Sequence, residues 1–355
     1  MEQIDAHQLF NTSWTLHRLS PLHHSKDCET LLDNESALKT YATRLRDQLT
    51  GAVIAGIHSA SAAEDDALSK TGALKECLWQ PITAGSPRDA ASSRRSTPSF
   101  PGILVTLEYE FIVYKAALLA DSDSSNGKEE TQREGSTFLP LLLTRFPNAL
   151  RQTFISFLSA NFDTYCSPLR LPSALLCSGL ETYVEALRDG RSARASDYIE
   201  DVIKELQLTL SFSPSIAPAL RSLNVSIARA SLAGFLRDGP STAASKTRSL
   251  QQKLRSPLFA NLTTYLESHL AMTLDMDGSA TDQRARQHVR LSKVACAAFV
   301  LGSEGRMKLV VSANRDEDGA SVGRGRDSSF QRALRASETL LRAVVRRAAV
   351  GEQTT

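Results

Sequence analysis

The sequence predicts an α+β fold: helices packed on one face of an antiparallel β-sheet, disordered insertions and a C-terminal amphipathic helix. Two apolar periods alternate along the chain, one of two residues as in half-buried strands, the other of three to four residues as in helices. The strands expected at 205–213 and 222–228 are joined by "PSIAPALR". This link is too short for the usual crossover helix, so we expect the two strands to pair antiparallel.

The stretch "LFNTSWTLHRLSPLHH", residues 9–24, predicts the first strand. Aromatic and β-branched residues alternate with polar ones, which is typical of a half-buried strand. The face expected to be buried carries Phe10, Thr12, Trp14 and Leu16. Pro21 ends the strand, because proline has no N–H to donate to a neighbouring strand.

The same stretch raises the question of a metal site. His17, His23 and His24 precede Cys28, but their spacing matches no zinc pattern, and no second cluster supplies further ligands. We therefore expect ordinary solvated histidines at the end of a strand, and no metal site.

Four segments predict helices, at 34–51, 147–162, 172–190 and 257–274. Their apolar faces are expected to hold Leu38, Tyr41, Ala42, Leu45 and Leu49; Leu150, Phe154, Phe157 and Leu158; Leu176, Leu180, Tyr183, Val184 and Leu187; and Leu258, Leu262, Tyr265, Leu266 and Leu270. Gly51 is a natural stop for the first helix, and "AVIAGIHSA" after it reads as a short strand.

"ILVTLEYEFIVY", residues 103–114, predicts one long strand with a buried face opposite Glu108 and Glu110. The face expected to be buried holds Ile103, Val105, Leu107, Tyr109, Phe111 and Val113. Polar segments rich in Ser, Pro, Gly and charge, at about 80–100 and 120–136, predict mobile loops.

The last part of the chain predicts a hairpin, a linker and a helix. "HVRLSKVACAAFVLG" reads as one long strand, which a tight turn at 302–305 joins to a second strand. We expect one α+β domain over 1–312, a flexible linker over 313–328 and a basic amphipathic helix over 329–350. The apolar side of this helix holds Phe330, Leu334, Leu341, Val345 and Ala348.

Composition narrows the class of protein. The 355 residues carry a net charge of +2, so any surface for a polyanion must be local. Five cysteines without a CxxC pair suit a reducing compartment. The N-terminus has no signal-peptide pattern, and no apolar run approaches the ~20 residues that cross a bilayer. We expect a soluble intracellular protein.

The usual sequence signatures of catalysis are missing. The chain has no phosphate-binding loop, no dinucleotide fingerprint, no HExxH pair and no nucleophile elbow. Cys166, Cys177 and Cys296 lie in apolar surroundings, which suit inert core thiols. We expect no catalytic residue and no cofactor.

Several blocks together resemble the fungal centromere protein L family of inner-kinetochore subunits. They are "FNTSWTLHRLSPLHH", "YATRLRDQL", "LLLTRFPNALRQTFISFL", "SPLRLPSALLCSGLETYV", "LTLSFSPSIAPALRSLNVSI" and "HVRLSKVACAAFVLGSEGRMKL". They occur in this order from residue 9 to about 311. The resemblance implies curved antiparallel sheets, a nuclear protein at the centromere and kinetochore, and a non-enzymatic role in the constitutive centromere-associated network during chromosome segregation.

The resemblance also implies a partner, a centromere protein N-type (CENP-N-type) subunit, with which the chain helps to connect centromeric chromatin to the kinetochore. Family analogy, together with the long apolar strand, makes the 288–311 hairpin the candidate interface. The candidate partner-binding residues are Val289, Leu291, Val294, Ala298, Val300, Leu309 and Val311. Neither a membrane nor a small-molecule substrate is expected.

The basic helix supports a separate hypothesis, contact with DNA or an acidic protein, which rests on charge alone. Its candidate residues are Arg332, Arg335, Arg342, Arg346 and Arg347. A packed helix with solvated arginines is an equally good interpretation. The rival class is a small-ligand-binding or enzymatic α+β protein, for which Glu108 and Glu110 with His58 are the least poor candidates.

Overall fold

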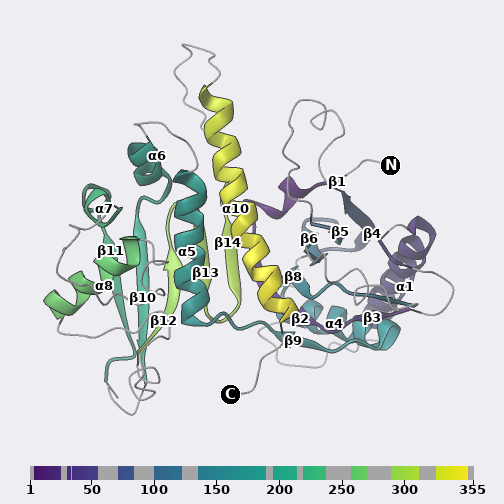
Figure 1. Ribbon diagram of the computed structural model, residues 1–355. Coiled ribbons are helices and arrows are strands. Elements are labelled where there is room, and N and C mark those ends of the chain that lie inside the picture. The colour runs from purple at the N-terminus through teal and green to yellow at the C-terminus, as the bar shows by residue number, and fades with distance from the viewer. Residues whose placement is uncertain are drawn as a thin grey trace. The chain divides into compact units, whose positions relative to one another are not determined.

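A computed structural model describes residues 4–24, 30–32, 34–54, 71–83, 100–121, 135–188, 195–213, 219–236, 257–270, 289–311 and 325–350. These residues form helices and antiparallel β-sheets, which confirms the α+β class (Figure 1). The chain divides into two compact units, unit 1 with residues 1–169 and 344–355, and unit 2 with residues 170–343. Among the described residues, no helix is both long and apolar enough to span a bilayer.

Unit 1 is built on a sheet with the strand order β1-β4-β5-β6-β8-β2, and β9 also pairs with β2. Every pairing for which the register is known is antiparallel, except that of β1 with β4. The strands are β1 (Ile4–Asp5), β2 (Ser13–Leu19), β4 (Leu74–Thr83), β5 (Gly102–Tyr109), β6 (Val113–Leu119), β8 (Leu141–Arg145) and β9 (Cys166–Pro168). A short 3-10 helix, Ala6–Leu9, precedes β2, and β3 (Leu22–His23) pairs with β7 (Ser136–Thr137).

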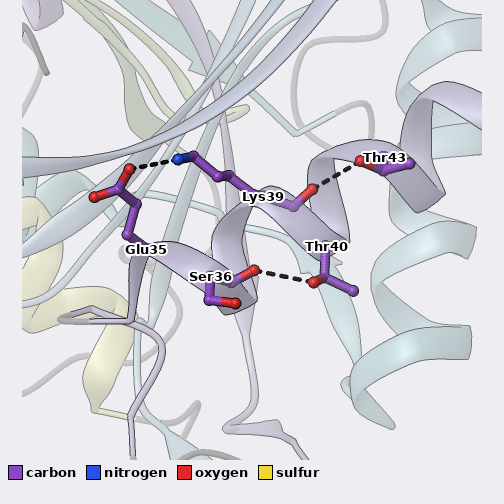
Figure 2. Close-up of a pocket in the computed structure, with 5 residues that line it drawn as sticks. All are labelled: Glu35, Ser36, Lys39, Thr40 and Thr43. Carbon is purple, nitrogen blue, oxygen red and sulfur yellow. Dashed lines mark hydrogen bonds and ion pairs between the residues drawn. The ribbon is translucent and has the colours of Figure 1, made fainter.

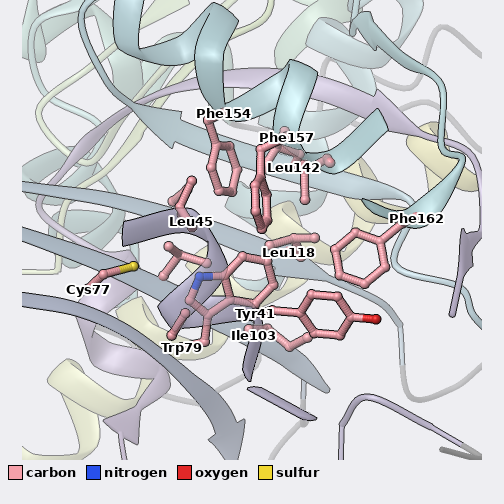
Figure 3. Close-up of a cluster of buried hydrophobic side chains, with 14 of the residues drawn as sticks. Tyr41, Leu45, Cys77, Trp79, Ile103, Leu118, Leu142, Phe154, Phe157 and Phe162 are labelled. Carbon is pink, nitrogen blue, oxygen red and sulfur yellow. The ribbon is translucent and has the colours of Figure 1, made fainter. Parts of the chain in front are cut away.

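The core of unit 1 lies between this sheet and two helices, α1 (Glu35–Ile54) and α4 (Asn148–Phe162). Trp79 of β4 lies at its centre, with ring centroids 6.0–6.3 Å from Phe154, Phe157 and Phe162 (Figure 3). Aromatic pairs at this spacing stabilise a core beyond the area that they bury. The opposite face of the sheet is buried too, at Leu104, Ala117, Leu119, Leu141 and Leu143.

Unit 2 has a second antiparallel sheet, with the order β14-β13-β12-β10-β11. Its strands are β10 (Leu206–Phe212), β11 (Ser222–Ile227), β12 (Val289–Ala295), β13 (Phe299–Gly302) and β14 (Arg306–Leu309). Its helices are α5 (Ser173–Arg188), α6 (Ala195–Val202), α7 (Arg229–Leu236), α8 (Pro257–Leu270) and most of α10 (Gly325–Ala349). Helix α5 packs on β12 (Figure 1).

A glycine allows α5 to approach its neighbours closely. A Cβ atom on Gly179 would lie 2.9 Å from a methyl carbon of Leu340 and 3.6 Å from one of Leu301. The first distance is shorter than side chains tolerate, so this turn of α5 needs glycine to pack against α10 and β13.

Several predicted elements are confirmed. Helices α1, α4, α5 and α8 lie where the apolar spacing predicts, and β10 and β11 pair antiparallel in a continuous register. The residues predicted for the four apolar helix faces are buried, except Tyr265, which is exposed, and Leu270, whose side chain lies outside the described set. On α10 the apolar side is buried at Leu334, Leu341, Val345 and Ala348, while Phe330 is half-buried.

The predicted single strand at 103–114 is wrong. It is a hairpin, β5 and β6, with the turn at Glu110–Ile112. Phe111 and Val113 are exposed rather than buried. The turn contains no Gly, Pro, Asn or Asp, so the sequence gives no turn signal there.

Other boundaries are also corrected. Helix α1 continues past Gly51 to Ile54, so the strand predicted at 52–60 does not begin there, and residues 55–60 lie outside the described part. The loop predicted from about 80 starts later, because Pro81–Thr83 belong to β4. Helix α10 begins at Gly325, inside the predicted linker, and the first strand begins at Ser13.

Candidate interaction surfaces

The residues proposed for an enzyme do not form a site. Glu108 and Glu110 are exposed at the end of β5 and in the turn after it, and His58 lies outside the described residues. No group of three His, Cys, Asp or Glu side chains that could hold a metal ion occurs in the described part of the chain.

A shallow hollow on α1 offers no reactive group either. It is lined by one helix face, Glu35, Ser36, Lys39, Thr40 and Thr43 (Figure 2). Four of these side chains already bind one another or the helix backbone: Lys39 pairs with Glu35 at 2.7 Å, Thr40 donates to the Ser36 carbonyl oxygen, and Thr43 donates to that of Lys39. A binding pocket needs polar groups that converge from several elements, and this surface has none.

The histidines differ from the prediction. His17 and His24 are buried instead of solvated, and only His23 is exposed. Burial, with a contribution from the positive charge of Arg151, lowers the pKa of His17 to about 4. His24 shares a hydrogen bond of 2.8 Å with the hydroxyl of Thr137. His17 is therefore a neutral part of the core at pH 7.

The cysteines behave as inert thiols. Burial raises the pKa of Cys77 and Cys166 to about 12 and that of Cys296 to about 11. A thiol is nucleophilic only as the thiolate, and at pH 7 these three remain protonated.

The hairpin predicted as the partner interface is an internal part of unit 2. The stretch 289–302 forms two strands, β12 and β13, and β12 is paired on both sides, with β10 and β13. Five of the seven candidate side chains are buried, and Val289 and Val300 are half-buried. Lysine in place of Val294 or Ala298 would put a charge into the core. A loss of partner binding in such variants would therefore not separate a damaged interface from a damaged fold.

The arginines of α10 are largely engaged within the protein. Arg332 lies over the ring of Tyr198 at 4.5 Å, and Arg346 pairs at 2.6 Å with the buried carboxylate of Asp121. Arg342 and Arg347 are half-buried, and Arg335 is exposed. DNA binding by this helix stays a prediction, and two of its five candidate arginines, Arg332 and Arg346, contact other groups of the protein.

A different basic surface lies on the open face of the unit 2 sheet. Leu206, Leu208 and Leu210 of β10 are buried on the helix-covered face, so Gln207, Thr209 and Ser211 point to the other face. The register extends this open face across the sheet: Thr209 pairs with Lys293, Lys293 with Gly302, and Gly302 with Arg306.

The open face carries four cations and no carboxylate. Its cations are Arg290, Lys293, Arg306 and Lys308, of which the first three are exposed. None of the residues in β10, β11, β12, β13 and β14 is Asp or Glu. Around the cations lie the uncharged polar residues Gln207, Thr209, Ser211, Ser222, Asn224 and Ser226. We call this surface the basic sheet face.

The second feature of unit 2 is its free edge, β11. This strand pairs with β10 over six consecutive residues without a bulge, and no described strand pairs with its other side. The backbone N–H of Phe212 donates to the carbonyl oxygen of Arg221 at 3.1 Å. Hydrogen-bonded pairs alternate along an antiparallel ladder, so the backbone groups of Ser222, Asn224 and Ser226 point away from β10.

This edge lacks the usual protection against pairing. Natural edge strands are blocked by charged residues, proline or bulges, and "SLNVSI" has none of these. Sequence reasoning missed both surfaces. The sequence does show that the five strand segments contain no acidic residue. It does not show that their cations lie on one face, because that depends on how the strands pair.

The chain also matches a known family. The family model described as Centromere protein L matches residues 8–349, nearly the whole chain. The match includes α10, which lies beyond the blocks of the sequence resemblance. A search of curated proteins finds none that matches.

Proposed function

Because this chain belongs to the centromere protein L family, which acts at the centromere and kinetochore, we propose that it is a non-enzymatic structural subunit of the inner kinetochore in the nucleus. It pairs with a centromere protein N-type subunit and so helps to connect centromeric chromatin to the kinetochore. The absence of converging reactive groups among the described residues is in keeping with this role.

The observation that carries the pairing is the unprotected edge of β11. An extended strand of a partner can add to such an edge through main-chain hydrogen bonds, and its side chains then contact alternate residues of the strand. Leu223 and Val225 are half-buried, which leaves apolar surface for a partner strand. The proposal therefore moves the interface from the interior strand β12 to the edge strand β11.

Proline at position 224 tests this interface. The N–H of Asn224 points away from β10, so Asn224→Pro removes a donor that only an added strand uses. We expect affinity for a purified centromere protein N-type subunit to fall about tenfold or more, while the isolated chain stays folded. Light scattering after size exclusion measures the complex, and circular dichroism the fold.

Asn224→Ala is the matched control. It removes the 2.8 Å side-chain bond with Thr209 but keeps the backbone donor. The proposal predicts an intact one-to-one complex for this variant. Equal loss with proline and alanine, or none with either, would contradict an interface at this edge.

A second candidate function, contact with centromeric DNA, is favoured by the basic sheet face. Arginine and lysine bind phosphates without regard to sequence, and neutral hydroxyls and amides add hydrogen bonds. The five strands themselves contain no carboxylate, and the nearest exposed acids, Glu205 and Glu304, lie at the strand ends. This surface replaces α10 as the stronger candidate for nucleic acid.

Charge reversal on this face measures the contact. Lys293→Glu with Arg306→Glu should weaken binding of a duplex, and each lost phosphate contact lowers the logarithmic salt slope by about 0.9. Arg335→Glu, at an exposed arginine of α10, is the matched control. If Arg335→Glu weakens binding and the sheet variant does not, the nucleic-acid surface is α10 and not the sheet.

A further inference from the structure

The turn between β5 and β6 exposes three apolar residues in a row. Phe111 is 74% exposed, Ile112 39% and Val113 42%. Single exposed apolar residues are common on soluble proteins, but contiguous patches mark binding surfaces. We call these three residues the apolar turn.

The apolar turn is held in place by its own backbone. The N–H of Tyr109 donates to the carbonyl oxygen of Ile112, that of Glu110 to Ala73, and that of Phe111 to Thr71, at 2.9–3.1 Å. The segment Thr71–Ala73 thus braces the turn from one side.

Glycine is needed in this brace. Gly72 has a φ of +76°, which side chains rarely adopt, and an added Cβ would lie 2.5 Å from Cβ of Glu110 and 3.1 Å from the ring of Phe111. A residue other than glycine would displace the turn. The exposure of Phe111 is therefore a feature of an ordered structure and not of a frayed loop tip.

Carboxylates lie directly beside the apolar turn. Glu76 of β4 lies directly opposite Glu108 of β5, and Glu108 lies opposite Val113 of β6, so the three form one row on the sheet. Glu110 is in the turn itself. Like charges directly opposite each other destabilise a sheet, so the pair of Glu76 and Glu108 is unfavourable for the fold by itself.

Three cations lie one step farther from the turn. Lys75 is exposed beside Glu76 at a break in the register, Lys115 lies two residues along β6 from Val113, and Arg145 of β8 lies opposite Lys115. The two charged side chains that directly adjoin the turn are both carboxylates: Glu110 precedes Phe111 in the chain, and Glu108 lies opposite Val113.

We propose that the apolar turn docks a basic protein segment. Aliphatic or aromatic side chains of that segment contact Phe111, Ile112 and Val113, while its Lys and Arg side chains pair with Glu76, Glu108 and Glu110. The carboxylates disfavour a nucleic-acid phosphate or an anionic lipid at the same place. The site lies in unit 1 and is independent of the partner edge and the basic sheet face of unit 2.

A random peptide library displayed on phage is the probe, selected on the immobilised full chain. Counter-selection uses Phe111→Ser with Ile112→Ser. The proposal predicts enriched peptides that combine Lys or Arg with aromatic or aliphatic residues. Fluorescence anisotropy of an enriched peptide should show at least about tenfold weaker binding to this double variant, because anchors in an apolar contact carry most of its affinity.

Two further variants separate charge from general stickiness. Glu76→Gln with Glu108→Gln should weaken the same peptide about threefold to tenfold at low salt, and the loss should shrink as salt is added. Tyr165→Ser removes an aromatic residue that is also 74% exposed, and it should leave the affinity unchanged.

Three results would overturn the proposal: enrichment of acidic or uncharged peptides, equal binding to the Phe111→Ser, Ile112→Ser variant, or no enrichment at all. Binding to neutral phosphatidylcholine vesicles that requires Phe111 would assign the turn to a membrane and also overturn it. The variant with Phe111→Ser and Ile112→Ser should still bind the centromere protein N-type subunit. A failure of the docking proposal can therefore be told apart from a failure of the β11 interface.

Discussion

The two sheets of this protein are buried in different ways. In unit 1 the central strands are buried on both faces: four consecutive residues of β5, Gly102–Val105, and four of β8, Leu141–Thr144, are inaccessible. In unit 2, β10 alternates between buried leucines and accessible polar residues. The central strands of unit 1 therefore offer no open sheet face, whereas one face of the unit 2 sheet is accessible to solvent.

The largest effect should come from a change on the covered face of the unit 2 sheet. Val294 is fully buried beneath the helices, so Val294→Lys places an unpaired charge in the core and should cost more than about 4 kcal/mol of unfolding free energy. The adjacent Lys293→Ala, on the open face, should change stability by no more than about 0.5 kcal/mol. Urea denaturation of both variants measures the contrast, and similar losses would show that the face is not open.

A cavity in unit 1 tests the doubly buried sheet. Trp79 is 2% exposed and lies against three phenylalanines, so Trp79→Ala should cost about 3–5 kcal/mol. Thermal or urea unfolding measures this loss. Leu78→Ala, at the half-buried neighbour on the same strand, is the control and should cost clearly less.

The pH dependence of stability sharpens the picture of the unit 1 core. The pKa of His17 is about 4 in the folded state against 6.5 when solvated, so between these values only the unfolded chain takes up this proton. Unfolding free energy should therefore fall as the pH drops from 6.5 to 4, by up to about 3 kcal/mol. His17→Gln should remove this part of the slope, and an unchanged slope would mean that His17 is accessible to protons in the fold.

The smallest effect concerns the end of α10. Asp121 is buried and Arg346 pairs with it, so Arg346→Ala should destabilise unit 1 by about 1–3 kcal/mol. Arg335→Ala, at an exposed arginine of the same helix, should be close to neutral. If both substitutions change the thermal unfolding temperature equally, the pair of Arg346 with Asp121 does not stabilise the protein.

Elements with a strong period were predictable from sequence. Helices α1, α4 and α5 and strands β10 and β11 follow from apolar spacing, and the antiparallel pairing of these two strands follows from the short link between them. The sequence did not predict that residues 103–114 and 289–302 each form two strands, because the turns after Tyr109 and after Ala295 contain no Gly, Pro, Asn or Asp. Strand β4 was missed, since "LKECLWQPIT" mixes charged, polar and apolar residues without a clean alternation.

The interaction surfaces depend on information that only the fold supplies. Lys293 and Arg306 come together through the register of three strands, and the edge of β11 exists because no described strand follows it. The sequence predicted an interface in the 288–311 segment partly from its apolar character, and most of those apolar side chains are buried within unit 2. That interface stays a prediction. Apolar content alone does not separate an interior strand from an interface strand.

Hydrogen–deuterium exchange across β11, with and without a centromere protein N-type subunit, tests the central claim most directly. In the isolated chain the amides of Ser222, Asn224 and Ser226 face away from β10 and should exchange quickly. If a partner strand adds to this edge, those three amides become protected in the complex. A stable complex in which they exchange as fast as in the free chain would contradict the account.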